Sequence, residues 1–251
     1  MIEINQISKS YQDTKVLDNI TTTIKKGGIT SIIGPNGAGK STLLSIIGRL
    51  LMADAGFVKV NDFDVVTTAS DKLATCLSVL RQENQFASRL TVEELVGFGR
   101  YPYTKGRLNI EDKQKIDESL SFLNLTELRY RYLDELSGGQ RQRAYVAMVL
   151  CQNTQYVLLD EPLNNLDMKH AVIMMKLLRR AADELGKTII LVIHDINFAS
   201  VYSDQIIAMK SGKLSYHGTP RQIMKSEIIE DIFDTPVDVR ELNNDLIALY
   251  Y

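Results

Sequence analysis

The chain has 251 residues, of which 45% are hydrophobic and 24% are charged, and its formal net charge at pH 7 is −2. This composition is typical of a globular protein with one large domain or two small ones. The near-neutral charge gives no overall attraction to nucleic acid or acidic lipid. No apolar run approaches the roughly 18–20 residues of a membrane span, and residues 1–6 lack the pattern of a signal peptide. We therefore expect a cytosolic chain in which Cys76 and Cys151 are reduced thiols.

The first part of the chain reads as short strands around one helix. Apolar and polar residues alternate over 2–9, with a slip near the end, and 16–24 is a second strand-like run. Residues 29–33 form a β-branched apolar run typical of a buried strand, and 42–47 read as a helix. Two further strands are predicted at 57–60 and 77–80.

The sequence pattern of residues 86–152 differs from that of the preceding part and predicts helices. Thr91 begins a predicted helix with a capping box, and the helix at 110–123 places Ile116, Leu120 and Leu123 on one face. Between them, 97–106 reads as an exposed aromatic and basic loop. Strand patterns resume afterwards, so we predict a single domain over 1–251. Its core would comprise 1–85 and 153–251, with a helical subdomain inserted at 86–152.

The last part of the chain alternates strands and helices. A strand at 156–160 precedes a helix at 168–185, which Gly186 closes, and a buried strand at 188–193 precedes His194. A hairpin is predicted around Ser211 and Gly212, and the tail from 220 mixes short helices with strand-like segments. The helix carries a stripe that we assign to the core: Ala171, Met175, Leu178, Ala182 and Leu185.

A phosphate-binding pattern, G-x-x-x-x-G-K-[ST], lies between the strand at 29–33 and the following helix. It consists of Gly34, Pro35, Asn36, Gly37, Ala38, Gly39, Lys40, Ser41 and Thr42. Backbone N–H groups at such a turn and helix start form an anion-binding nest. Lys40 supplies a charge to the β- and γ-phosphates, and the Ser41 hydroxyl suits Mg²⁺. A glycine-rich turn that merely caps a helix is the simpler alternative, and the correct flanks disfavour it.

Two carboxylates, Asp160 and Glu161, end the strand at 156–160. Ligands of open α/β sheets bind beyond the carboxyl ends of strands. Asp160 could hold Mg²⁺ beside the phosphate-binding loop at 34–42 (the P-loop), and Glu161 could polarise a water aimed at the γ-phosphate. A solvated turn before Pro162 is the alternative, which the P-loop in the same chain makes less favourable.

A second glycine motif comprises Ser137, Gly138, Gly139 and Gln140. Ser137 and Gln140 fit an ordinary capping box. Glycine at the first helical positions costs about 1 kcal/mol each relative to alanine, which a ligand touching the backbone would explain. The motif would then be a second anion site. Two head-to-tail copies, each lending this motif to the P-loop of the other, would use both sites.

Together these motifs resemble the nucleotide-binding subunit of ABC transporters over nearly the whole chain. The resemblance implies an α/β fold of ABC ATPase type: a RecA-like P-loop NTPase core, an antiparallel β subdomain and the helical insertion. It implies that Gln82 touches Mg²⁺ and the attacking water and that His194 contacts the γ-phosphate. Tyr11 would stack on adenine, although a plain turn residue fits it too. A strand-end histidine in ordinary hydrogen bonds is the alternative for His194.

The loop segment Asn164, Asn165, Leu166 and Asp167 then occupies the D-loop, where it departs from the commoner Ser-Ala-Leu-Asp. His170 and His217 have no motif context and are interpreted as structural or exposed. Residues 99–103 resemble a Gly-Arg-x-Pro-His stretch in ATPases of iron–siderophore, haem and cobalamin importers, with Tyr103 in place of the usual histidine. The short tail after the hairpin also suits that group.

The resemblance therefore predicts an ATP- and Mg²⁺-dependent hydrolase that powers an importer, with an iron–siderophore complex as the expected cargo. The expected partners are a second copy of the chain, two transmembrane permease subunits and, indirectly, an extracytoplasmic binding protein. No nucleic-acid partner is expected. The predicted location is the cytoplasmic face of the membrane. The alternatives are an exporter ATPase, a non-transport ABC ATPase in DNA repair or translation, and a non-catalytic scaffold. Filled catalytic positions disfavour the scaffold, and a single cassette without a coiled coil disfavours the non-transport form.

Overall fold

The structure is a computed structural model that describes residues 1–82 and 89–250, and it divides into two compact units. Unit 1 comprises Met1–Thr68 and Thr188–Tyr251, and unit 2 comprises Ala69–Lys187. The predicted boundary between residues 85 and 86 lies outside the described residues. Within the described ranges, no helix is long and apolar enough to cross a membrane.

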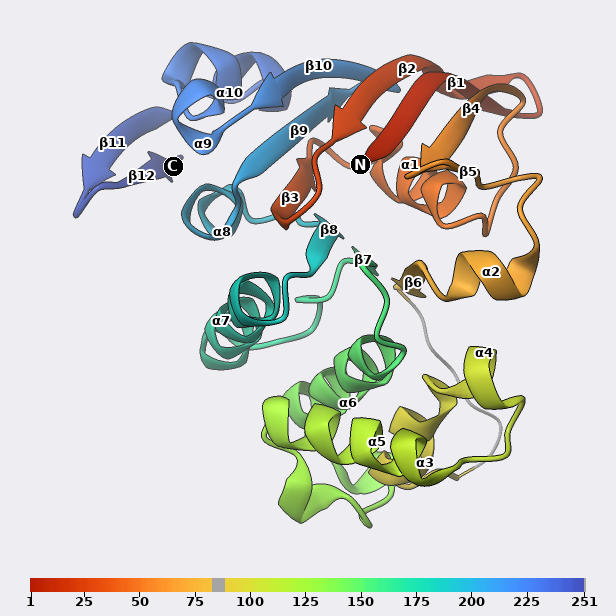
Figure 1. The fold of residues 1–251 in the computed structure, drawn as a ribbon. Coiled ribbons are helices and arrows are strands. Elements are labelled where there is room, and N and C mark those ends of the chain that lie inside the picture. Colours follow the sequence, from red (N-terminus) through yellow and green to blue (C-terminus); the bar gives the residue numbers. More distant parts are fainter. Residues whose placement is uncertain (83–88, 251) are drawn as a thin grey trace. The chain divides into compact units, whose positions relative to one another are not determined.

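Unit 1 contains one antiparallel sheet of order β2-β1-β4-β5 and a second set of strands in which β3 pairs in parallel with β8 and β9 (Figure 1). The predicted slip near the end of the first strand is confirmed: its pairing shifts register after Ile4, and Gln6 has a φ of 51°. Strand β9 also pairs with β10 around the predicted hairpin turn. The strands are β1 Ile2–Tyr11, β2 Thr14–Ile24, β3 Gly28–Ile33, β4 Ala55–Val60, β5 Phe63–Asp64, β8 Thr188–Val192, β9 Gln205–Lys210 and β10 Lys213–Gly218.

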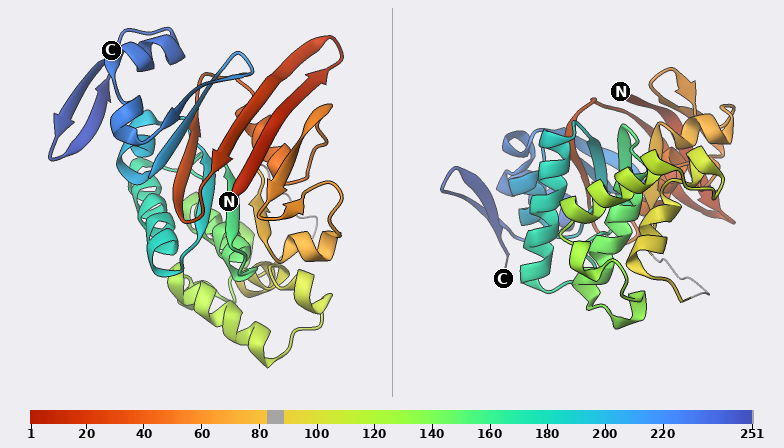
Figure 2. Two further views of the ribbon diagram at one scale, coloured as in Figure 1. Left: turned by 45° about the horizontal axis from the view of Figure 1, so that its top comes forward. Right: turned by 60° about the horizontal axis from the view of Figure 1, so that its bottom comes forward.

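The helices and tail of unit 1 follow the predicted order. Helix α1 starts directly after the glycine loop, and α8 starts after the loop that carries His194. In the tail, the predicted mixture of short helices and strands is confirmed. Strand β12 of the terminal hairpin, whose two strands end the chain in Figure 2, contacts α8 through Asn197 and Ala248. The bounds are α1 Lys40–Ile47, α8 Ile196–Tyr202, α9 Pro220–Ile223, α10 Ser226–Phe233, β11 Asp238–Leu242 and β12 Asp245–Leu249.

Unit 2 combines a parallel strand pair with a cluster of helices. Strands β6 and β7 pair from Leu77 opposite Tyr156 to Leu80 opposite Leu159. Helices α3, α5 and α6 pack on one another (Figure 1). The predicted apolar face of Ile116, Leu120 and Leu123 is buried there. The elements are α2 Ser70–Ala74, β6 Leu77–Leu80, α3 Val92–Phe98, α4 Tyr101–Thr104, α5 Ile110–Phe122, η1 Thr126–Leu128, η2 Leu133–Glu135, α6 Gly138–Cys151, β7 Tyr156–Asp160 and α7 Met168–Glu184.

The predicted core stripe of α7 is confirmed at four of its positions. Ala171, Met175, Leu178 and Ala182 are buried, whereas Leu185 is 46% exposed and lies just beyond the end of the helix. Both cysteines are free, with Cys151 buried and Cys76 half-buried.

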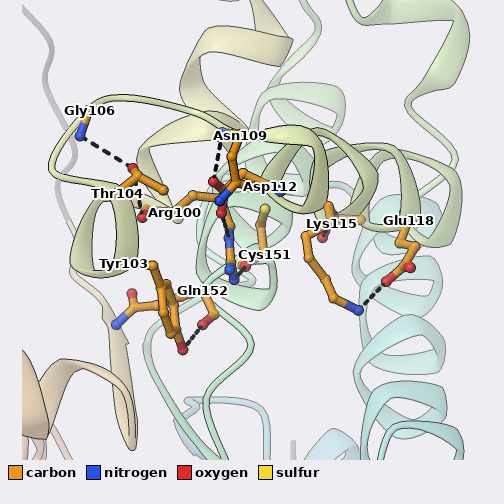
Figure 3. Close-up of polar contacts among 11 residues, drawn as sticks. Arg100, Tyr103, Thr104, Gly106, Asn109, Asp112, Lys115, Glu118, Cys151 and Gln152 are labelled. Carbon is orange, nitrogen blue, oxygen red and sulfur yellow. Dashed lines mark hydrogen bonds and ion pairs between the residues drawn. The ribbon is translucent and has the colours of Figure 1, made fainter.

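The prediction of an exposed loop at 97–106 is wrong in two respects. Residues 97–98 end α3 and residues 101–104 form α4, and Arg100 is only 5% exposed. Its Nε donates to Asp112 Oδ1 at 2.9 Å and its Nη1 to the carbonyl of Cys151 at 3.0 Å (Figure 3). The guanidinium also lies 4.1 Å from the centre of the Tyr103 ring, and the Tyr103 hydroxyl donates to the carbonyl of Gln152 at 2.9 Å. Arg100 thus joins the start of α4 to α5 and α6, whereas Tyr101 and Tyr103 are 56% and 43% exposed, as predicted.

Candidate functional site

The glycine loop of unit 1 folds as a tight turn between β3 and α1. Gly34 and Gly39 have φ values of 145° and 93°, a region that only glycine enters easily. A Cβ on Gly34 would lie 2.0 Å from the carbonyl oxygen of Met209, and one on Gly39 would lie 2.7 Å from that of Val16. Neither position therefore tolerates a side chain, and the backbone of β9 closes in on the loop where the sequence pattern required glycine.

The donors around this loop fit a polyphosphate. Lys40 is 5% exposed, and its Nζ donates to the carbonyls of Gly34 at 2.8 Å and Pro35 at 2.9 Å. The N-cap of α1 is Gly39, so no N-cap side chain covers the first N–H groups of the helix. A helix start with uncapped N–H groups and an adjacent ammonium is an anion-binding arrangement. Ser41, the predicted magnesium ligand, is half-buried in the first turn.

Two further predicted site residues of unit 1 lie at strand ends. Tyr11 is the last residue of β1 and is 48% exposed, and the Lys9 ammonium lies 5.9 Å from the centre of its ring. His194 is exposed beyond the end of β8, next to Asp195, whose carboxylate caps α8 by accepting from Asn197 N at 2.8 Å. His194 also lines a cavity of about 220 Å³ together with Tyr250.

In unit 2 the structure brings Gln82 and Glu161 together. Gln82 Nε2 donates to Glu161 Oε2 at 2.7 Å. The side-chain amide of Asn164 donates to the same oxygen. Glu161 adopts a left-handed φ of 50° at the strand end, directly after the buried Asp160. Two amides thus orient one carboxylate oxygen. Sequence reasoning missed the contact of Asn164, which it assigned only to the D-loop.

The predicted capping box at the start of α6 is confirmed. Ser137 Oγ accepts from Gln140 N at 3.3 Å, and Gln140 Oε1 accepts from Ser137 N at 2.9 Å. Ser137 and Gly138 are exposed, whereas Gly139 is buried. The two glycines of the motif therefore have different surroundings, and only the first is open to a ligand from outside the unit.

Gly139 packs against His170, a residue that sequence reasoning left without a site role. A Cβ on Gly139 would lie 2.4 Å from His170 Cδ2. The ring cannot swing away freely, because its Nδ1 lies 2.7 Å from Asp167 Oδ1, and the same oxygen accepts from His170 N at 2.8 Å. The backbone N–H and then the ring of His170 lower the pKa of Asp167. His170 thus gives Gly139 a packing reason to be glycine in addition to any ligand.

We expect Gly139→Ala to lower the free energy of unfolding by about 1–3 kcal/mol, because the new methyl group overpacks against His170. In a His170→Ala background the same change should cost little or become favourable, because alanine is the better helix former by about 1 kcal/mol. Urea unfolding of the unaltered chain, the two single variants and the double variant measures these free energies as a double-mutant cycle. An equal cost in both backgrounds would contradict the packing explanation.

Comparison with known proteins agrees with this geometry. The family model for the ABC transporter matches residues 17–164. The petrobactin import ATP-binding protein FatE of Bacillus anthracis is 56% identical over 250 residues, covering 100% of both chains. YclP of Bacillus subtilis (strain 168), with the same description, is 50% identical over 251 residues, also covering 100% of both.

The chain belongs to the ABC transporter family.

More distant ABC proteins extend the comparison. The ferric enterobactin transport ATP-binding protein FepC of Escherichia coli (strain K12) is 39% identical, covering 91% of this chain and 85% of that protein. Among solved structures, the ATP-binding cassette MJ0796, a dimer bound to ADP and Pi after hydrolysis, has a TM-score of 0.78 at 31% identity and covers 88% of this chain and 99% of that one.

Several predictions from sequence are thereby confirmed. The fold is the α/β ABC ATPase type, the chain resembles the iron–siderophore importer ATPases, and it is an ATP-binding ATPase of the transport family. The roles of the individual site residues and the domain limits stay predictions.

Proposed function

We propose that this ABC ATPase hydrolyses ATP to drive the import of an iron–siderophore complex. The observation that carries the proposal is Glu161, a carboxylate at the end of a strand with one oxygen held by the amides of Gln82 and Asn164. That geometry suits a group that accepts a proton from, or orients, an attacking water. The choice of cargo is supported by the relatives, two of which are named for petrobactin import and align over their full length.

In the proposed mechanism, the N–H groups of the glycine loop and of α1 bind the phosphates. The Lys40 ammonium, now held by loop carbonyls, adds a charge at the β- and γ-phosphates. Tyr11 stacks on the base. Mg²⁺ is proposed to be held by Ser41, Gln82 and Asp160, where it neutralises phosphate charge when bound. The hydroxyl, amide and carboxylate oxygens of these side chains are ligands that suit this hard cation.

Hydrolysis then depends on Glu161 and His194. Glu161 holds the water, with its free rotation limited by Gln82 and Asn164. His194 donates to charge that develops on the γ-phosphate. Two copies are proposed to close head to tail, so that the exposed start of α6 at Ser137 and Gly138 of one faces the phosphates held by the other, whereas Gly139, which the sequence prediction also placed there, is buried against His170. The exposed Ser137 and Gly138 leave this helix start open to a partner.

The proposed assembly lies on the cytoplasmic face of a membrane. Two permease subunits would contact the helical part of the chain between Gln82 and Tyr103, a stretch that includes residues outside the described ranges. An extracytoplasmic binding protein would deliver the iron complex. The dimeric state described for MJ0796 supports the pairing of two cassettes.

We expect Lys40→Ala to weaken ATP binding by about 10–100-fold, because a charge-assisted contact with phosphate contributes roughly 1.5–3 kcal/mol. Titration with a fluorescent ATP analogue measures the affinity. Lys176→Ala, which removes an exposed lysine of α7, is the matched control and should bind normally. Unchanged affinity in Lys40→Ala would count against the phosphate-binding assignment.

A further inference from the structure

A second cavity, of about 380 Å³, is lined by residues of unit 2, and none of them has a role in the proposed hydrolysis. Its walls come from α5, the end of α6 and the segment that follows α7. Phe122, Leu123, Leu150 and Leu185 supply apolar surface. The volume falls in the range of about 300–1,000 Å³ that is typical of small-molecule sites, which combine apolar walls with few polar groups.

Lys187 lines this cavity and carries a buried ammonium group. It is 7% exposed, and its Nζ donates to Asn153 Oδ1 at 2.9 Å and to the carbonyl of Thr154 at 2.8 Å. Both acceptors are neutral, and within the described ranges no carboxylate lies at ion-pair distance from this ammonium. An ammonium has three N–H donors, so one remains. Burial of a charge without a counter-charge is costly, and an anion in the cavity would relieve that cost.

The other ionisable groups that line the cavity leave its charge at about +1. Lys115 Nζ pairs with Glu118 Oε2 at 2.8 Å, so these two charges offset each other (Figure 3). Burial raises the pKa of the Cys151 thiol to about 11, which keeps it neutral at pH 7. Burial and then the charge on Lys115 lower the pKa of Lys187, as expected for an ammonium without a counter-charge.

We propose that this cavity binds a small organic monoanion, a carboxylate on an aromatic or aliphatic body. The carboxylate would accept the remaining N–H of Lys187 and balance its charge, while the body packs against Phe122, Leu150 and Leu185. One uncompensated charge favours a monocarboxylate over a phosphate ester, because Lys187 is the one cation among the described lining residues that has no carboxylate partner.

A tryptophan reporter tests this proposal, because the chain contains no tryptophan. Leu185 lines the cavity and is 46% exposed, so Leu185→Trp places a fluorophore at the rim with little disturbance of the fold. Benzoate is the probe, and benzamide is the uncharged molecule of the same shape. Tyr130→Trp, at a position that is 73% exposed and outside the cavity lining, is the control.

We expect benzoate to change the fluorescence of Leu185→Trp saturably and to bind at least about tenfold more tightly than benzamide, the factor expected of a charge-assisted hydrogen bond. The fluorescence of Tyr130→Trp should not change. Adding Lys187→Met, which keeps a similar side-chain volume without the charge, should weaken benzoate by the same factor and leave benzamide unaffected.

Ligand-observed NMR on the unaltered chain repeats the comparison of benzoate with benzamide without any substitution, in case the double variant does not fold or the tryptophan blocks the cavity. Preference for benzoate supports the site. No binding of benzoate to the unaltered chain, equal affinities for the two probes, or benzoate binding that survives Lys187→Met would each overturn the proposal.

Discussion

Replacing Glu161 with glutamine is expected to leave ATP binding intact while lowering turnover by about 10²–10⁴-fold, equivalent to about 3–5 kcal/mol of activation free energy. Glutamine keeps the side-chain shape but cannot accept a proton from water. It also changes the carboxylate that receives hydrogen bonds from Gln82 and Asn164. Steady-state phosphate release and equilibrium nucleotide binding, measured on the same preparation, separate the two effects.

A matched control for this experiment is Glu127→Gln, an exposed carboxylate in η1 of the same unit. It should hydrolyse ATP at the normal rate. Near-normal hydrolysis by Glu161→Gln would remove Glu161 from the proposed role and leave the ordered carboxylate without a chemical explanation. Loss of nucleotide binding together with turnover would instead point to misfolding of the strand end.

Replacing Arg100 with methionine is expected to lower the free energy of unfolding by about 3–5 kcal/mol. The change leaves the buried Asp112 carboxylate without its counter-charge. Arg100 and Asp112 are 5% and 1% exposed, and their ion pair is 2.9 Å long. Denaturant unfolding measures the change. The paired replacement, Arg100→Met with Asp112→Asn, should cost less than the sum of the two single changes.

An exposed ion pair provides the control for Arg100. Arg221 and Glu241, whose side chains are 68% and 50% exposed, form a contact of 3.1 Å. Arg221→Met should change the unfolding free energy by less than about 1 kcal/mol. If Arg100→Met and Arg221→Met lowered the free energy of unfolding by similar amounts, the burial of Arg100 would not explain the loss.

The buried pair of Arg100 and Asp112 makes the free energy of unfolding depend on pH in the acidic range. Burial opposes ionisation of Asp112, but the N–H of Asn109 and the Arg100 guanidinium outweigh it, so the pKa of Asp112 lies below its ordinary value of 3.8. A lowered pKa in the folded state means that the contribution of this carboxylate is present above 3.8 and disappears as the pH falls through the folded value. Asp112→Asn should therefore lose less stability than the unaltered chain on acidification.

Local patterns explain why so much of this molecule could be predicted from its sequence. The glycine loop, the capping boxes at Thr91 and Ser137 and the buried strand before His194 each depend on residues close in sequence. The contacts that were missed join residues far apart in the chain. A charged residue such as Arg100 reads as exposed until Asp112 and the carbonyl of Cys151 are known to face it.

Two glycines also show that sequence motifs do not reveal tertiary contacts. Gly34 is required by the close approach of the Met209 carbonyl, which lies on a distant strand, although the motif alone identified the position. Gly139 was attributed to a ligand alone, and the structure adds His170 as a second reason. A motif can therefore identify the residue type correctly while the physical cause comes from a tertiary contact that spacing does not encode.

The measurement that tests the account most directly is ATP-driven uptake in proteoliposomes that contain this subunit, its permease subunits and the binding protein. ATP is supplied on the side that carries this subunit, and radioactive ferric siderophore on the other. We predict that the loaded binding protein stimulates ATP hydrolysis, that iron enters, and that Glu161→Gln abolishes both. An ATP hydrolysis rate that does not change when the ferric siderophore is added, or iron transport that continues in Glu161→Gln, would contradict the proposed function.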